Sequence, residues 1–570
     1  MEVTVADAGL ACKNDNRGCC EDLRVEISVP KELLANGLGE TVSPEVAEES
    51  KRSRFTIRQL GARSLRANTA SNLVARAWTA GLAIICVPQY LRLMGVEAYG
   101  LVGFFSSAQL LLAFFDFGLG ATLNRELAMA SVTRSLVQNV RHLARTLESI
   151  YWSVALILGV AWIALAPWLS HSWIHAKQIA PGQVQWAITL MGLVLIFQWP
   201  FNLYLSGLMG MQHQVLANAV LMVVATLRSF GAVAALWVFT PTVRVFFTWQ
   251  AVVAVPGTAA IALVFWKWLP RGSPAHFSLG ELRRVSDFST GLIRISAVSL
   301  LLSNLDKILL SRLLPLESFG YYMLAMTVAS GLYVFASALY GALYPRFSQY
   351  YASGDSAKLA ALYHCAAQGL TVALGPLALC LALFPREALL LWTGNEATAL
   401  RAGRVLTVLL MACMLNALMY MPYALTLSHG WTSFLFKLNF VAVVLFVPLL
   451  LILVRWYGAV GAAGAYLMLN AGYVFIAAPL MHRRLLCGQF WNWFIGDVTT
   501  PLAAALAPIL AIRLAAPQIS SRYSAAMLLT LAFATAFITS CFAARLVLSQ
   551  AVETVRRLAR TRVPRMTPVN

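Results

Sequence analysis

Apolar stretches long enough to cross a membrane recur almost without pause along this 570-residue chain. A helix rises about 1.5 Å per residue, so about 20 apolar residues cross a hydrocarbon layer about 30 Å thick. In lipid a helix also satisfies its own backbone hydrogen bonds. We therefore predict an all-α polytopic membrane protein with about 14 transmembrane helices. The expected spans are 70–93, 98–124, 149–170, 184–208, 214–240, 244–269, 288–313, 318–345, 361–385, 402–427, 433–455, 458–480, 498–516 and 523–548.

The composition supports this class, because 59% of the residues are hydrophobic and only 12% are charged. A cytosolic enzyme, a fibrous protein and a disordered scaffold are all excluded by that balance. The formal net charge is nevertheless +19. In a membrane protein, Lys and Arg gather on cytoplasmic loops and near anionic lipid headgroups, so we expect the bilayer and not nucleic acid as the partner.

The basic segments also predict the orientation. They are the region 51–66, the connections 125–145 and 267–284, the residues 482–484 and the tail 556–562. With an even number of spans all of them fall on one face, and the positive-inside rule makes that face, and both termini, cytoplasmic.

An internal repeat divides the chain. Residues 93–100 read like residues 313–320, a shift of 220, and residues 200–206 read like residues 422–428, a shift of 222. Six spans separate the members of each pair, so the two copies have the same orientation in the membrane. Parallel repeats of this kind are a transporter architecture in which two bundles rock around a site between them. Pro200 and Pro422, at matching positions, are the predicted hinges, although static kinks are an equal alternative.

The repeat and the composition together predict five segments. They are a disordered cytoplasmic tail (1–67), an N-terminal six-helix bundle (68–270), a C-terminal six-helix bundle (271–484), two additional transmembrane helices (485–548) and a basic cytoplasmic tail (549–570). No Cys pair with metal-ligand spacing and no nucleotide-binding loop occurs, so we expect no catalytic residue, metal or cofactor.

Several short motifs resemble a known family. Residues 98–101, 116–120 and 124–128 resemble the N-terminal hairpin of bacterial polysaccharide biosynthesis membrane proteins, and residues 304–310, 319–322 and 343–347 resemble the start of their second bundle. These proteins are the O-antigen and exopolysaccharide repeat-unit flippases of the multidrug/oligosaccharidyl-lipid/polysaccharide exporter superfamily.

The resemblance implies two six-helix bundles around a cavity that opens alternately to the two faces of the bacterial inner membrane. It implies a polyprenyl-pyrophosphate-linked oligosaccharide as substrate, moved from the cytoplasmic to the periplasmic leaflet for exopolysaccharide, capsule or O-antigen synthesis. Other polysaccharide synthesis and polymerase proteins are implied partners, and the two extra helices are associated in some members with a groove for the lipid tail.

Ionisable residues inside spans are costly and generally face a cavity or a partner. Cations outnumber acids among them, and Arg pairs well with phosphate oxygens in a poorly solvated cavity. The candidate substrate-binding residues are Arg294, Arg228, Arg76, Lys307 and Lys437. Lys437 lies close enough to the inner face to extend its amino group to the interface instead.

Two acidic residues are candidates for coupling or structural ion pairs, Asp116 and Asp306. Arg76 lies 19 residues before Gly95 and Asp116 lies 21 residues after it, so their depths differ by about 3 Å and a pair is feasible. Asp306 and Lys307 suggest either an adjacent charge pair or an ion relay. The position equivalent to Asp116 in the second bundle is an alanine, so Arg294 lacks such a local partner. We predict that Arg294, together with Arg228, meets the substrate pyrophosphate, and that Arg76 with Asp116 is mainly structural. The alternative for Arg294 is a bond to a helix carbonyl or extension to the cytoplasmic interface.

Two rival functions stay open. A multidrug or cation antiporter of the same superfamily would be expected to have an acidic cavity, whereas the intramembrane excess here is positive. A membrane polysaccharide polymerase or ligase would need a large outer loop, and the outer connections predicted here are short.

Overall fold

The computed structural model describes residues 44–116, 118–130, 137–284, 304–515, 521–546 and 549. Within these ranges the chain is helical with connecting turns and has no strand, which confirms an all-α protein. Met1–Leu65 and Arg66–Asn570 are separate compact units, and the packing below is that of the second. Helix α1 (Pro44–Leu112) begins within the predicted tail, whose first 43 residues lie outside the described ones, as does nearly all of the predicted tail 549–570.

Eleven helices among the described residues are long and apolar enough to cross a membrane. Two of them, Ala70–Leu110 and Thr432–Leu485, are 41 and 54 residues long, about twice what one crossing needs. Each is interrupted by a glycine in the left-handed region, Gly95 with φ 84° and Gly458 with φ 56°. Each therefore folds back as two passes, because glycine adopts this conformation without a Cβ clash. Most of the predicted span 288–313 lies outside the described residues.

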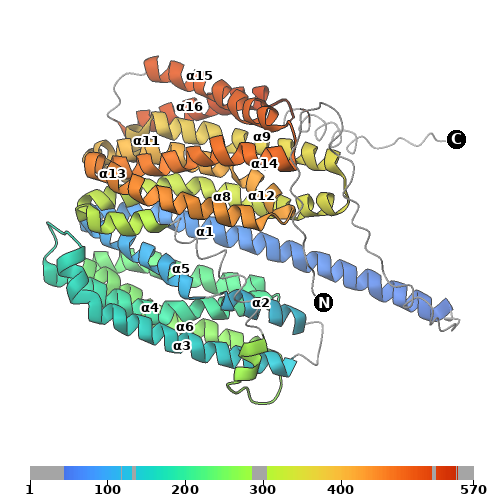
Figure 1. The fold of residues 1–570 in the computed structure, drawn as a ribbon. Helices are drawn as coiled ribbons and strands as arrows, with labels where there is room; N and C mark the ends of the chain where they lie inside the picture. Colours follow the sequence, from blue (N-terminus) through green and yellow to red (C-terminus); the bar gives the residue numbers. More distant parts are fainter. Residues whose placement is uncertain are drawn as a thin grey trace, which may run out of the picture. The chain divides into compact units, whose positions relative to one another are not determined.

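The first bundle contains the part of α1 that follows residue 66 and the helices drawn from blue to green in Figure 1. Those elements are η2 (Ala113–Asp116), α2 (Leu119–Ala130), α3 (Val137–Trp168), η4 (Leu169–Trp173), α4 (Pro181–Gly210), α5 (Gln214–Val238) and α6 (Val243–Trp268). Helix α4 is central, because 61% of its apolar window is buried against its neighbours.

The second bundle follows the helical residues 304–313. Its elements are α8 (Leu316–Ala352), α9 (Ser356–Leu383), α10 (Pro385–Thr393), α11 (Glu396–Leu418), α12 (Tyr420–Ser428), α13 (Thr432–Gly472), η5 (Tyr473–Ala477) and α14 (Ala478–Leu485). Helices α9 and α11 are the most buried, at 72% and 67% of their windows. Asp355 and Asn395 cap the first turns of α9 and α11 through their side-chain oxygens.

The two additional helices pack on the second bundle. They are formed by η6 (Asn492–Thr499) with α15 (Thr500–Ala515), and by α16 (Arg522–Ala543). Both lie beside α9, and Figure 1 shows them in red next to it. A small apolar core that includes Phe384, Ala505 and Ala536 joins these elements.

The two bundles meet where the turns at Gly95 and Pro315 lie, which we call the hairpin end. A Cβ on Gly100 would lie 2.6 Å from the backbone oxygen of Leu316, and a Cβ on Gly320 would lie 2.3 Å from that of Val96. Backbones approach this closely between membrane helices only where glycine removes the side chain. The hydroxyls of Tyr99 and Thr327 are also hydrogen-bonded across the contact, at 3.0 Å.

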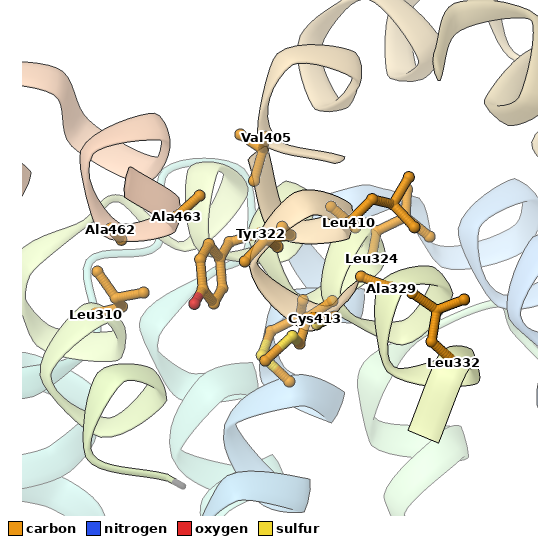
Figure 2. Packing of buried hydrophobic residues seen from close by; sticks show 14 of the residues in the cluster. Leu310, Tyr322, Leu324, Ala329, Leu332, Val405, Leu410, Cys413, Ala462 and Ala463 are labelled. Carbon is orange, nitrogen blue, oxygen red and sulfur yellow. The ribbon is translucent and has the colours of Figure 1, made fainter. Parts of the chain in front are cut away.

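The core of the second bundle is built from four separate segments. Figure 2 shows Tyr322 of α8 surrounded by Leu310, Val405 of α11 and Ala463 of α13. Tyr322 is fully buried, and its hydroxyl donates a 2.8 Å hydrogen bond to Asp306. This core therefore holds the 304–313 segment against α8 by both apolar packing and a buried polar contact.

The predicted hinge prolines lie in different surroundings. Pro200 is buried inside the continuous helix α4. Pro422 follows an interruption of the helix, because α11 ends at Leu418 and α12 begins at Tyr420. A proline has no N–H to donate to the preceding turn, which accounts for a break one turn before it. Whether either proline moves stays a prediction.

Candidate functional site

Arg228 lies inside the first bundle, in the middle of α5. Its Nε donates to the side-chain oxygen of Gln250 on α6 at 2.8 Å, and the amide nitrogen of Gln250 donates back to the Arg228 carbonyl at 3.2 Å. Arg228 also lines a cavity of about 120 Å³ together with Gln198 and Asn202 of α4. The guanidinium thus has neutral amide neighbours, and no carboxylate of the described residues pairs with it, so its charge is available to an anion.

Arg76 and Asp116 are not brought together. Arg76 is exposed on α1, and its Nη1 lies 3.5 Å from the Ser337 hydroxyl of α8, across the boundary between the bundles. Asp116 instead accepts a hydrogen bond from the Tyr151 hydroxyl of α3, and the backbone of Gly120 also hydrogen-bonds to it. Similar depth was a valid argument for the pair, but depth does not fix the direction in which each side chain points.

Asp306 and Lys307 form a buried ion pair, with Nζ and Oδ1 3.2 Å apart. The two residues are 1% and 8% exposed, and Tyr322 completes the contacts of the carboxylate. Close by, the hydroxyls of Tyr333 and Tyr466 are hydrogen-bonded at 3.0 Å. The pair is thus enclosed in the second bundle, where a charge requires compensation.

The remaining predicted cations lie elsewhere. Lys437 is exposed near the start of α13. Arg294 lies outside the described residues, so its role stays a prediction. Among the residues that the structure describes, no group of three His, Cys, Asp or Glu side chains is placed to hold a metal ion.

A cavity of about 510 Å³ lies in the second bundle, between α8, α11, α12, α13, η5 and α14. Five of its lining residues are tyrosines and three are asparagines. They are Tyr340, Tyr420, Tyr423, Tyr466, Tyr473, Asn416, Asn439 and Asn470. Its volume falls in the range of small-molecule sites, about 300–1,000 Å³.

This cavity was not predicted, since the sequence interpretation weighed charges and not neutral polar groups. Asn416, Asn439 and Asn470 each fall inside a predicted apolar span. An amide in hydrocarbon costs free energy unless it has a hydrogen-bond partner, so three of them in neighbouring spans were the available signal.

A second cavity, of about 660 Å³, lies at the hairpin end. Its lining includes Glu97 and Glu317, which are 220 residues apart and therefore equivalent in the repeat. Glu97 accepts hydrogen bonds from the backbone N–H groups of Lys177 and Gln178, and Glu317 accepts one from Arg401. Each carboxylate thus ties its hairpin turn to its own bundle.

Comparison with known families gives two matches. The family described as polysaccharide biosynthesis protein matches residues 65–351, which is half of the chain. The family described as MatE matches residues 292–452. No curated protein sequence matches the chain.

Solved structures share the fold at low sequence identity. A lipid II flippase, MurJ, in an inward closed conformation, superposes with a TM-score of 0.61 at 12% identity, covering 84% of this chain and 99% of that one. The MATE multidrug transporter DinF-BH gives 0.54 at 15% identity, covering 76% and 96%. An inward-facing MATE transporter of the MOP superfamily gives 0.52 at 13% identity, covering 73% and 96%.

Proposed function

Because the chain belongs to the polysaccharide biosynthesis protein family, we propose that it is a flippase for polyprenyl-pyrophosphate-linked oligosaccharide repeat units. It moves them from the cytoplasmic to the periplasmic leaflet of a bacterial inner membrane, with both termini cytoplasmic. The family match over residues 65–351 is the observation that carries this proposal. The fold of a multi-pass MOP-superfamily transporter supports it.

The contact between the bundles supports alternating access. Gly100 and Gly320 join repeat-related helices at the hairpin end. We assign this end to the periplasmic face, opposite the basic loops, by the positive-inside rule. A transporter of this architecture works when two rigid bundles rock about a site between them. This state is then closed to the periplasm, and substrate enters from the cytoplasmic side.

The pyrophosphate is bound by cations within the membrane-spanning bundles. Arg228 faces a cavity among neutral amides, and Arg76 reaches the boundary between the bundles. Arg294 is the third proposed phosphate-binding residue, with Lys307 and Lys437 as further cations. Asp116 and Asp306 form structural pairs or couple transport to an ion gradient. Pro200 and Pro422 are the hinges of the motion.

Leaflet-resolved analysis of lipid-linked sugars tests the proposal. Deletion of the gene should accumulate the repeat unit on the cytoplasmic leaflet, whereas accumulation on the periplasmic leaflet would indicate a polymerase or ligase. Complementation with Arg228→Gln should reduce flipping about tenfold or more, since a charge-assisted phosphate contact contributes about 1.5–3 kcal/mol. The exposed Arg455→Gln serves as the matched control.

Export of a cationic drug is the second candidate, favoured by the MatE match over residues 292–452. The acidic residue that would bind a cationic drug in the second bundle is Asp306, and it already forms an ion pair with Lys307. Drug-accumulation assays separate the two functions: deletion that raises cellular drug content and leaves lipid-linked sugars unchanged would refute the flippase.

A further inference from the structure

The 510 Å³ cavity of the second bundle is neutral and lined by groups that both donate and accept hydrogen bonds. None of its thirteen lining residues, all within the described part of the chain, carries a charge. Phenol hydroxyls and carboxamides each offer donors and acceptors. We propose that this cavity binds an uncharged sugar ring of the translocated glycan, an inference that rests on the proposed flippase function.

Three tyrosine rings form one side of the cavity. The ring centroid of Tyr340 on α8 lies 6.2 Å from that of Tyr420 and 6.1 Å from that of Tyr423, both on α12. Among the described residues none of these three hydroxyls has a hydrogen-bond partner. By contrast, the fully buried Tyr322 and Tyr363 bond to Asp306 and His482. Tyr340, Tyr420 and Tyr423 thus keep their hydroxyls for a ligand.

Three amides also line the cavity. Asn416 donates to the Asn470 oxygen at 2.7 Å, Asn470 donates to the carbonyl of Tyr466 at 2.8 Å, and Asn439 accepts from Tyr473 at 3.2 Å. These bonds fix the amide orientations before a ligand arrives, which lowers the entropic cost of binding. They come from α11, α13 and η5, so the site exists only in the folded bundle.

This lining selects against the other parts of the substrate. A polyprenyl tail would leave the hydroxyls of Tyr340, Tyr420 and Tyr423 without partners, at about 1–3 kcal/mol for each buried group. A pyrophosphate would require a cation inside the cavity. A pyranose ring suits both kinds of lining group, because its C–H faces pack on aromatic rings while its hydroxyl rim exchanges hydrogen bonds with phenols and amides.

The cavity is also placed next to a proposed phosphate-binding residue. Arg76 contacts Ser337, and Tyr340 lies three residues further along α8, on the same face and about 4.5 Å along the axis. Pro422 stands between Tyr420 and Tyr423, just after the break between α11 and α12. Movement at this break would reshape the tyrosine wall and so link sugar binding to the motion of the bundle.

Binding to the purified full-length protein in nanodiscs tests the inference. The two probes are undecaprenyl pyrophosphate carrying a neutral trisaccharide and the same lipid without sugar. Tyr340→Leu and Tyr423→Leu should each weaken binding of the glycosylated probe about three- to tenfold, the range of an aromatic contact, and leave the bare lipid unchanged. Tyr457→Leu, an exposed tyrosine outside the cavity, should change neither.

The outcomes separate the two levels of the proposal. Wild-type protein that binds neither probe refutes the flippase and this inference together. Wild-type protein that binds both probes equally, or leucine variants that keep full preference for the glycosylated probe, refutes the sugar site alone. Should the leucine variants fold poorly, Tyr340→Phe and Tyr423→Phe keep the rings and remove only the hydroxyls. These two variants should show a smaller loss of preference for the glycosylated probe, about two- to fivefold. An unchanged preference in both variants would overturn the inference.

Discussion

Gly100 and Gly320 occupy equivalent positions in the two repeats, and each lies against a backbone oxygen of the opposite hairpin. Their contacts, Leu316 and Val96, are also 220 residues apart, so the interaction is reciprocal. A self-complementary contact of this kind is what a two-fold relation between two parts produces. The repeat seen in the sequence is therefore also a pseudo-two-fold relation in space at this point.

Alanine at Gly320 is expected to open the hairpin end. Its Cβ would lie 2.3 Å from the backbone oxygen of Val96, so the bundles must separate. Flipping should fall at least tenfold, and disulfide crosslinking between Tyr99→Cys and Thr327→Cys should become slower. Gly331→Ala on the same helix is the matched control, because a Cβ there meets nothing within 4 Å. Equal crosslinking in both variants would contradict the role of this contact.

Neutralising one member of the Asp306–Lys307 pair is expected to destabilise the second bundle. Asp306→Asn or Lys307→Met alone leaves a buried charge and should cost about 3–5 kcal/mol. The double variant should cost clearly less than the sum, because neither charge then remains. Thermal midpoints in detergent for the four proteins of this cycle measure the coupling, and additive losses would show that the two charges do not interact.

Glu97→Gln is expected to loosen the connection that contains Lys177 and Gln178. The buried carboxylate accepts hydrogen bonds from both backbone N–H groups, and a neutral amide weakens them by about 1–2 kcal/mol. Faster hydrogen exchange at these two amides would be the evidence. Glu396→Gln is the control, since its exposed pair with Arg386 contributes about 0–1 kcal/mol; unchanged exchange in Glu97→Gln would argue against the tether.

Asp497→Ala is expected to weaken the docking of the additional helices. Asp497 of η6 accepts a 2.5 Å hydrogen bond from His364 of α9, and both side chains are mostly buried. Loss of this contact should cost about 1.5–3 kcal/mol and raise hydrogen exchange in η6 and α15. Glu396→Ala, at an exposed acid in the first turn of α11, provides the comparison. Equal exchange in the two variants would mean that apolar packing alone holds these helices.

The sequence predicted the kind of surroundings that some candidate residues have, whereas their role in substrate binding stays a prediction. Burial cost identified Arg228 and the Asp306–Lys307 pair as residues that need a cavity or a partner, and both have one in the structure. The suggested contact between Arg76 and Asp116 did not form, because their side chains point to Ser337 and Tyr151. Counting residues from a turn gives depth in the membrane, whereas the face of a helix on which a side chain lies depends on its neighbours.

The sequence by itself determined the helical class, the uneven distribution of loop charge and the two-fold repeat. These properties can be read from the sequence of each segment, because hydropathy, loop charge and glycine placement do not depend on which helices become neighbours in space. Only the tertiary structure decided which neutral polar groups face one another. Tyr340, Asn416 and Asn439 come from three helices and meet only after the bundle has packed. Their cavity depends on the rotation and spacing of those helices, which no single segment encodes.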